Sequence, residues 1–165
     1  GIILYPTDTI WGLGCDANND NAIKKIYQIK KRIENKSLIS LVSDKKMLKN
    51  YTNDIPEFDI TTKPTTVIYG NVKNLSTKII TKERTAAIRI TSDKFCKKLI
   101  KIFGNAIVST SANISGDSTP RSFSEISNYI KKNVDYIVNL RLEDKMEIPS
   151  SIIKINKDKS ITKIR

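Results

Sequence analysis

DKFCKKLIKIFGNAIVSTSANISG, residues 93–116, predicts a helix, a strand and a polar loop in immediate succession. Its apolar residues first recur three and four positions apart, as on one face of a helix that follows Ser92–Asp93. Gly104 then provides a helix stop. Ala106–Ser109 is short and mostly apolar, as a buried strand is, and the hydroxyl and amide side chains of 109–116 follow it. This order of elements is typical of an α/β protein.

The same alternation continues on both sides of this segment. Helical periodicity occurs at residues 22–27 and 47–51, and a further helix is predicted to start at Ser122, whose spacing to Glu125 fits a capping box. Short β-branched runs predict the remaining strands at Ile2–Tyr5, Leu38–Val42, Thr65–Tyr69, Ala86–Ile90, Tyr136–Asn139, Ser151–Ile155 and Ile161–Arg165. Together these patterns predict a sheet packed by helices, with polar loops at its strand ends where ligands gather.

The size and composition of the chain predict one domain, residues 1–165, in the cytoplasm. At 165 residues with 39% hydrophobic content, the chain is long enough to bury one ordinary core. Two cysteines without CxxC spacing favour a reducing compartment, and neither a signal peptide nor a membrane-spanning apolar run is visible. The apolar opening without an initiator methionine is consistent with a missing short terminal segment.

The net charge of +12 has two explanations that the sequence leaves open. It would suit a polyanionic partner such as nucleic acid or ATP. However, only six of the 29 basic residues are arginine, and the excess of lysine, isoleucine and asparagine is also what an AT-rich coding bias produces.

Several common chemistries are excluded or weakly supported. The absence of histidine removes the most frequent general base and metal ligand, and no Walker A motif occurs. The segment Gly12-Leu-Gly-Cys-Asp-Ala17 resembles a dinucleotide fingerprint, but no acidic ribose partner follows a second strand about 20 residues later. We therefore interpret Gly12 and Gly14 as turn formers.

Three groups of residues are candidates for a site, and each has a simpler structural explanation. Lys30-Lys31-Arg32 ends a helix, where it could complement the helix dipole or clamp a phosphate chain. The 109–116 loop could be turn chemistry or a set of donors for an anion. Arg89 interrupts an apolar strand and requires either an internal carboxylate or an anionic ligand.

Five segments, in order, resemble motifs of the YrdC/Sua5 family. PTDTIWGLGCDA (6–17), KKRIENKSLISLV (30–42), AAIRI (86–90), STSANISG (109–116) and PSSIIKI (149–155) are similar to the family patterns PTDT-[VI]-[YW]-GLG-x-DA, KxRPxxKPLSLLV, VAVRIP, STSAN-x-SG and PST-[VI]-[VI]-D. The departures are Ile33 and Ser37 at the two proline positions, and a reduced proline-glycine segment at Lys63-Pro64-Thr65-Thr66.

This resemblance implies an open, twisted, mixed β-sheet with flanking helices and a deep cleft. It also implies synthesis of threonylcarbamoyl-AMP and pyrophosphate from L-threonine, bicarbonate and ATP. The matching positions assign Lys30 and Arg32 to the triphosphate as the catalytic pair, and Ser111 and Asn113 to the nucleotide. The positions matching the threonine or carbamate site are Thr7, Arg89, Thr110 and Ser150.

The implied cofactor is Mg²⁺ that arrives with ATP, with no protein metal site. The implied partners are a downstream threonylcarbamoyl transferase and a tRNA modified at adenosine 37. Two alternatives remain open: a non-catalytic double-stranded RNA or tRNA-binding module of the same fold, and a carbamoyl-adenylate-forming relative within a larger maturation protein. The module would need no turnover, but RNP aromatics, a KH-type GXXG and zinc ligands are absent.

Overall fold

The computed structural model describes residues 1–34 and 38–165, and their strands form one mixed sheet. The helices are α1 (Asp20–Ile29), α2 (Lys45–Leu48), α3 (Lys94–Phe103) and α4 (Asn128–Lys132). The strands are β1 (Ile3–Tyr5), β2 (Gly12–Gly14), β3 (Ile39–Val42), β4 (Thr65–Tyr69), β5 (Ala86–Ile90), β6 (Ile107–Ser111), β7 (Tyr136–Ile137), β8 (Ser151–Ile155) and β9 (Ile161–Lys163).

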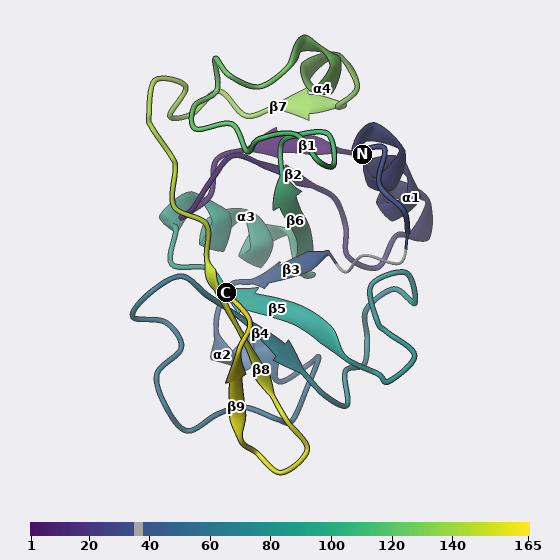
Figure 1. The fold of residues 1–165 in the computed structure, drawn as a ribbon, viewed down its shortest axis with the longest axis vertical. Helices are drawn as coiled ribbons and strands as arrows, with labels where there is room; N and C mark the ends of the chain where they lie inside the picture. The colour runs from purple at the N-terminus through teal and green to yellow at the C-terminus, as the bar shows by residue number, and fades with distance from the viewer. Residues whose placement is uncertain (35–37) are drawn as a thin grey trace.

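The sheet is open, with β7 at one edge and β9 at the other, in the order β7-β1-β2-β6-β3-β5-β4-β8-β9. The pairs β1–β7, β3–β5 and β4–β8 are parallel, and the other neighbours are antiparallel. In Figure 1, α1 and α4 lie near β1, β2 and β7, whereas α2 lies among the strands of the other half. The predicted mixed, open α/β sheet is therefore confirmed.

Strand β6 joins the two halves of the sheet. Its N-terminal part pairs with β3, with Ile107 opposite Leu41, and its C-terminal part pairs with β2, with Ser111 opposite Gly12. Because the strand is shared in this way, its end and the loop that follows lie where the two halves meet. The polar segment 109–116 starts there.

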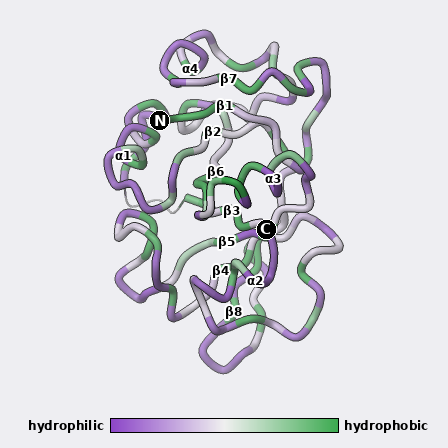
Figure 2. The backbone as a smooth tube through the Cα atoms, turned by 180° about the vertical axis from the view of Figure 1, so that it is seen from behind, coloured by the Kyte–Doolittle hydropathy of each residue, from purple (hydrophilic) through white to green (hydrophobic). Residues whose placement is uncertain are grey.

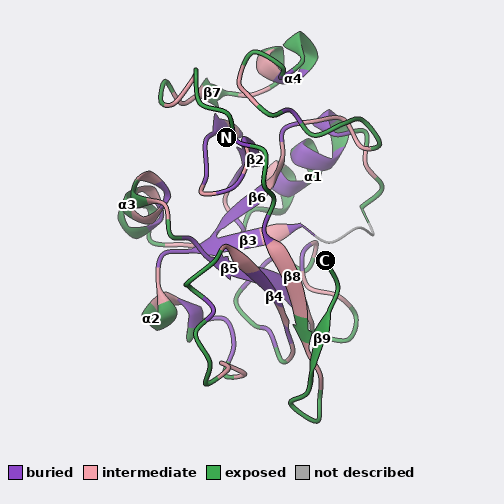
Figure 3. Ribbon diagram, turned by 60° about the vertical axis from the view of Figure 1, so that its left-hand side comes forward, coloured by how far each residue is buried: buried purple, intermediate pink, exposed green. Residues whose placement is uncertain are grey.

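Helices α1 and α3 pack in two different apolar clusters. Helix α1 contributes Ile23 and Ile26 to the larger cluster, and α3 contributes Cys96 and Ile100 to a smaller one around Tyr5. The central strands carry many of the apolar residues in Figure 2 and are largely buried in Figure 3, whereas β9 and much of α4 are exposed. Burial of these side chains is the main favourable term that fixes the two helices on the sheet.

Both long helices begin at side-chain caps, and α3 ends at the predicted glycine. The side chains of Asn19 and Asp93 accept hydrogen bonds from the third backbone N–H beyond them, at 2.9 and 2.7 Å. Gly104 adopts φ +82° and its N–H bonds to the Ile100 carbonyl, so α3 stops where the sequence indicated.

The interpretation of Gly12 and Gly14 as turn formers was wrong, because both lie within β2. A Cβ built on Gly14 would come within 2.6 Å of Tyr5 Cε1 and 2.9 Å of the Val108 carbonyl oxygen. The glycines therefore allow a buried tyrosine ring and two neighbouring strands to approach one backbone closely.

The predicted start of the fourth helix was also wrong. The helix begins at Asn128, where the Ser127 hydroxyl accepts a hydrogen bond from Ile130 N at 3.3 Å. The Glu125 carboxylate instead accepts from Arg121 N at 2.8 Å and pairs with that arginine's guanidinium. The expected capping box is thus replaced by a turn that leads into a short helix.

Candidate functional site

Lys30 connects the end of α1 to the loop after β6. Its side chain is buried, and Nζ donates hydrogen bonds to the carbonyl oxygens of Ser111 at 2.5 Å and Asn113 at 2.7 Å. The Lys30 carbonyl in turn accepts from Ser115 N at 2.8 Å. Two segments that lie about 80 positions apart in sequence are therefore held together by one ammonium group.

Burial and the neighbouring Arg32 charge lower the pKa of Lys30 to about 7. The two carbonyl acceptors favour the ammonium form, because they compensate part of the lost hydration. An ammonium has three donors, and the loop occupies two of them. The described part of the chain therefore leaves one donor for an anionic ligand.

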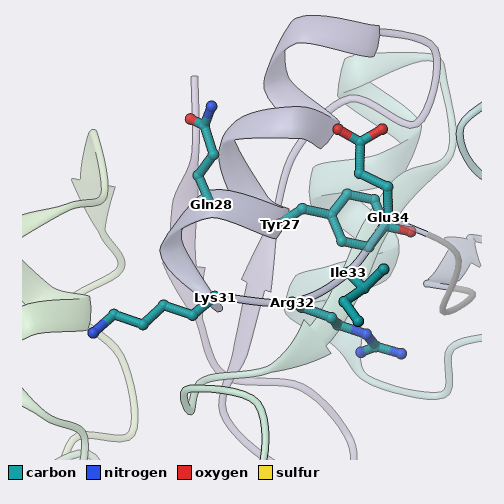
Figure 4. Close-up of a pocket in the computed structure, with 6 residues that line it drawn as sticks. All are labelled: Tyr27, Gln28, Lys31, Arg32, Ile33 and Glu34. Carbon is teal, nitrogen blue, oxygen red and sulfur yellow. The ribbon is translucent and has the colours of Figure 1, made fainter.

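Lys31 and Arg32 leave the backbone in different directions, as Figure 4 shows. Lys31 adopts φ +48°, a left-handed conformation, and its ammonium lies 5.3 Å from the centre of the Tyr129 ring on α4. Arg32 is half-buried, and burial lowers its pKa, with Tyr27 acting in the opposite direction. Arg32, Tyr27 and Lys31 line one pocket of about 300 Å³ with Gln28, Ile33 and Glu34.

Asn113 presents a buried acceptor at the same loop. Its Nδ2 donates to the carbonyls of Ile114 at 3.0 Å and Asp117 at 2.8 Å. Since both neighbours of this atom are acceptors, the amide orientation is determined by the network. The opposite atom, Oδ1, is buried without a hydrogen-bond partner among the described residues. Such an acceptor is available to an N–H or O–H donor of a ligand.

A second group of residues surrounds the loop between β1 and β2. The Arg89 guanidinium lies 3.0 Å from Asp8 Oδ1 and donates to Thr9 Oγ1 at 3.2 Å, with both charged side chains buried. Asp8 Oδ2 also accepts from the backbone N–H and hydroxyl of Ser92 at 2.9 and 3.0 Å. Of the two explanations for Arg89, the structure contains the internal ion pair.

Thr7 shapes this loop through its hydroxyl. Oγ1 donates to the Ile10 carbonyl at 2.8 Å and accepts from Thr9 N at 3.1 Å, which closes a tight turn. Thr7, Asp8 and Thr9 line a pocket of about 320 Å³, and residues between 141 and 148 form its other wall. Thr7 and Arg89 thus belong to one network.

The two remaining predicted residues have separate surroundings. Thr110 is half-buried in β6, opposite Leu13 of β2, and directly precedes Ser111. Ser150 is buried, and its hydroxyl shares a 2.8 Å hydrogen bond with Thr66 Oγ1 between β4 and β8. The structure joins Lys30 to Ser111 and Asn113, and it holds Ser150 through a different set of contacts. Ser37, which replaces a family proline, lies outside the described residues.

Sequence reasoning missed three residues of this region, namely Asp8, Thr9 and Arg141. The first two lie inside a recognised motif, and the isolated charge of Arg89 was a signal for a buried acidic partner such as Asp8. Arg141 had no such signal. Its guanidinium lies 2.9 Å from Asp93 Oδ2 and donates to the Thr7 carbonyl at 3.3 Å.

Within residues 1–34 and 38–165, no group of three or more cysteine, aspartate or glutamate side chains could hold a metal ion. Over the same residues, no helix has the length and apolar character needed to cross a membrane.

Comparison with known proteins identifies relatives across the chain. A family model for Sua5, YciO and YrdC proteins, described as telomere recombination, matches residues 1–165. A threonylcarbamoyl-AMP synthase of Idiomarina loihiensis is 33% identical over 147 residues, which cover 84% of this chain and 79% of the relative. A protein of the same name from Saccharophagus degradans is 35% identical over 138 residues, with 80% and 72% covered.

A solved structure has the same fold. Sua5 of P. abyssi in complex with L-threonine superposes with a TM-score of 0.84 at 24% identity. The match covers 99% of this chain and 49% of that Sua5 chain, so the present sequence spans about half of its length.

Proposed function

The chain belongs to the Sua5/YciO/YrdC family, and we propose that it is an L-threonylcarbamoyladenylate synthase that supplies tRNA modification. The name shared by relatives at about 33% identity over most of the chain supports this proposal. The structural observation that supports it most directly is the contact of Lys30 with the 109–116 loop, because this contact brings two of the five motifs together.

The reaction needs no protein nucleophile. The amine of threonine adds to CO₂, or to bicarbonate with loss of water, and gives a carbamate. A carbamate oxygen then attacks the α-phosphorus of ATP, and the bond to pyrophosphate breaks. The protein must align two anions and stabilise the charge on the phosphoryl oxygens, which is catalysis by positioning and electrostatics. A chain without histidine can supply both.

Lys30 and Arg32 are proposed to bind the triphosphate. The remaining donor of the Lys30 ammonium provides a point charge, and the Arg32 guanidinium offers paired donors to phosphate oxygens. Both groups have lowered pKa values because they are removed from water. A bound polyanion would raise both pKa values again, because it stabilises the charged forms of the two side chains.

Ser111 and Asn113 are proposed to hold the nucleotide. The contact with Lys30 fixes the backbone on which both side chains are mounted. The buried Asn113 Oδ1 accepts no hydrogen bond from the described residues, so it suits a donor of the nucleotide, such as a ribose hydroxyl or an exocyclic amine. The hydroxyl of Ser111 adds a neutral donor near the phosphates.

Threonine is proposed to bind in the pocket lined by Thr7 and Thr9. Arg89 lies behind this wall, where it holds Asp8 and Thr9 and balances the Asp8 charge that a substrate carboxylate would otherwise meet. Thr110, adjacent to Ser111, and Ser150 are assigned to the carbamate side of the same substrate. These assignments follow the motif positions.

Mg²⁺ is proposed to arrive with ATP. Its ligands would be mainly phosphate oxygens and water, since magnesium keeps several waters and binds to proteins largely through its substrate phosphates. When bound, the ion would neutralise charge on the triphosphate. The proposed tRNA and the downstream threonylcarbamoyl transferase would act on the released product.

Pyrophosphate release tests the proposal directly. Purified protein incubated with ATP, Mg²⁺, L-threonine and bicarbonate should release pyrophosphate, and omission of either threonine or bicarbonate should stop the release. Formation of ADP and phosphate would reject adenylyl transfer. Binding of double-stranded RNA or tRNA without any turnover would favour the non-catalytic module instead.

A further inference from the structure

Arg141 has a backbone conformation that bulky side chains rarely adopt. Its φ is +55°, in the left-handed region that favours glycine. A non-glycine residue remains in this conformation only where its surroundings hold it, and such positions concentrate at binding sites. The contacts of the Arg141 side chain therefore show what holds the backbone in this conformation.

The Arg141 side chain contacts both the loop between β1 and β2 and the start of α3. Its NH1 donates to the Thr7 carbonyl at 3.3 Å, and its NH2 lies 2.9 Å from Asp93 Oδ2. The other carboxylate oxygen of Asp93 caps α3 by accepting from Cys96 N. The Arg141 side chain is 26% exposed and the Asp93 side chain 12% exposed, so solvent and salt screen this ion pair only weakly.

The Thr7–Thr9 turn is thus held from two sides. Arg89 of β5 contacts Asp8 and Thr9 from the strand side, and Arg141 contacts the Thr7 carbonyl from the segment before β8. Arg141 also lines the pocket whose other wall is this turn. Loss of Arg141 would free one side of the turn and leave the Arg89 contacts in place.

We propose that Arg141 is a positioning residue for the amino-acid substrate: it fixes the Thr7 carbonyl and so sets the geometry of the pocket wall that receives threonine. The inference rests on the proposed function for its substrate. It predicts a selective effect, because the nucleotide residues are held by Lys30 through separate contacts.

Arg141→Gly is the decisive variant, because glycine adopts the left-handed backbone without strain while the two side-chain contacts are lost. We expect the KM for threonine to rise at least about 10-fold, as for loss of one charge-assisted contact, with less than about 3-fold change in kcat and in the KM for ATP. Arg141→Lys should be intermediate, since it keeps the charge but not the fork.

Two matched controls separate positioning from general damage. Arg121→Ala removes another arginine ion pair, with Glu125, that lies outside the pocket, and it should leave all kinetic constants unchanged. Asp93→Asn keeps a good helix cap but removes the charge beside Arg141, so it should shift the threonine KM in the same direction. Equal rises in both KM values for Arg141→Gly, or unchanged kinetics with a lower Tm, would overturn the inference.

A readout independent of turnover distinguishes failure of the inference from failure of the proposed function. The backbone N–H groups of Thr9 and Ile10 donate to Thr7 Oγ1 at 3.1 and 3.3 Å. Their hydrogen exchange should accelerate at least about 10-fold in Arg141→Gly and remain unchanged in Arg121→Ala. If wild-type protein releases no pyrophosphate, the proposed function fails, and unchanged exchange in Arg141→Gly would reject the positioning role by itself.

Discussion

At the end of α1, three consecutive cationic residues have three different surroundings. The Lys30 ammonium is buried against two carbonyls, Lys31 lies over the Tyr129 ring, and Arg32 is half-buried beside Tyr27. A helix-dipole role would require only positive charge near the last turn, and any of the three could provide it. Burial of two of them is a cost that an anionic ligand would compensate.

Arg32→Ala should abolish pyrophosphate release and leave the fold intact, and Arg32→Lys should not restore turnover fully. A lysine keeps the charge but loses the paired donors that match phosphate oxygens. If Arg32 only complemented the helix dipole, alanine would cost about 0.3–1 kcal/mol of stability and leave the kinetics unchanged. Pyrophosphate release and thermal melting of both variants are the measurements.

Lys31→Ala is the matched control for Arg32, because this side chain points away from Arg32 toward α4. It should retain near-wild-type turnover. Equal damage from Lys31→Ala, or normal turnover in Arg32→Ala, would remove Arg32 from the site.

The lowered pKa of Lys30 predicts a pH dependence of ATP binding. Because the folded-state pKa is about 7 and the ordinary value 10.5, the unfolded chain binds more protons between these values, so this group's contribution to stability rises with pH across that window. The triphosphate needs the ammonium form, so ATP affinity should fall as pH rises above about 7.

Calorimetric ATP titrations from about pH 6 to 9 would measure this dependence, with Lys30→Arg as the control. The arginine stays protonated throughout, so ATP affinity of this variant should change only with the titration of ATP itself. Identical pH profiles for the two proteins would show that the Lys30 ammonium does not titrate in this range.

At the scale of elements, strand β2 depends on its neighbours more than on its own sequence. Three residues with two glycines have a low intrinsic strand propensity. The strand forms because β1 and β6 pair with it on either side, and because Tyr5 packs over Gly14.

Gly14→Ala should therefore destabilise the protein by about 1–3 kcal/mol, as overpacking of a close interior contact does. The new methyl group would meet a buried ring and a backbone carbonyl, neither of which can move easily. Gly70→Ala is the matched control: among the described residues its Cβ would approach only Asp54 Oδ2, at 3.2 Å, so the variant should stay within about 0.5 kcal/mol of the wild type. Urea unfolding of the two variants measures both, and an equal effect would contradict the packing explanation.

Elements with a strong local pattern were predictable, and those made by distant contacts were not. Ala86–Ile90 and Ser151–Ile155 have their predicted bounds, because β-branched and apolar runs favour strands wherever they pack. The helix predicted to start at Ser122 does not form there, because the Glu125 carboxylate accepts a hydrogen bond from Arg121 N instead of forming a capping box with Ser122.

The same distinction applies to the candidate site. The KKR and STSAN segments were predicted to act together, and the Lys30 contacts place them together. Arg141 could not be found, since its contact with Thr7 spans 134 positions and no local pattern marks it. The roles of the eight predicted site residues stay predictions.

At the scale of the whole molecule, the net charge of +12 must be distributed over a surface that contains both lysines and aromatic rings. Two lysines lie over rings near α4: Lys31 over Tyr129, and Lys131 at 4.4 Å from the centre of the Phe123 ring. These contacts hold two positive charges on one side of the molecule. Two neighbouring ammonium groups of this kind are suited to contacts with phosphates. If coding bias alone explains the lysine excess, these two lysines need not contribute to RNA binding.

If the lysine excess forms a working surface, tRNA should bind weakly and with a steep dependence on salt. Each phosphate that the protein neutralises contributes about 0.9 to the slope of log affinity against log salt. Lys31→Ala combined with Lys131→Ala should thus reduce that slope by about 2 if each lysine contacts one phosphate.

Lys159→Ala, at the exposed turn between β8 and β9, is the control, because it removes a positive charge elsewhere; it should change the slope by less than about 0.5. Filter binding at several salt concentrations would measure all slopes. Absent or salt-insensitive binding would leave coding bias as the source of the charge, and equal slopes for the double variant and Lys159→Ala would exclude the α4 side as the contact surface.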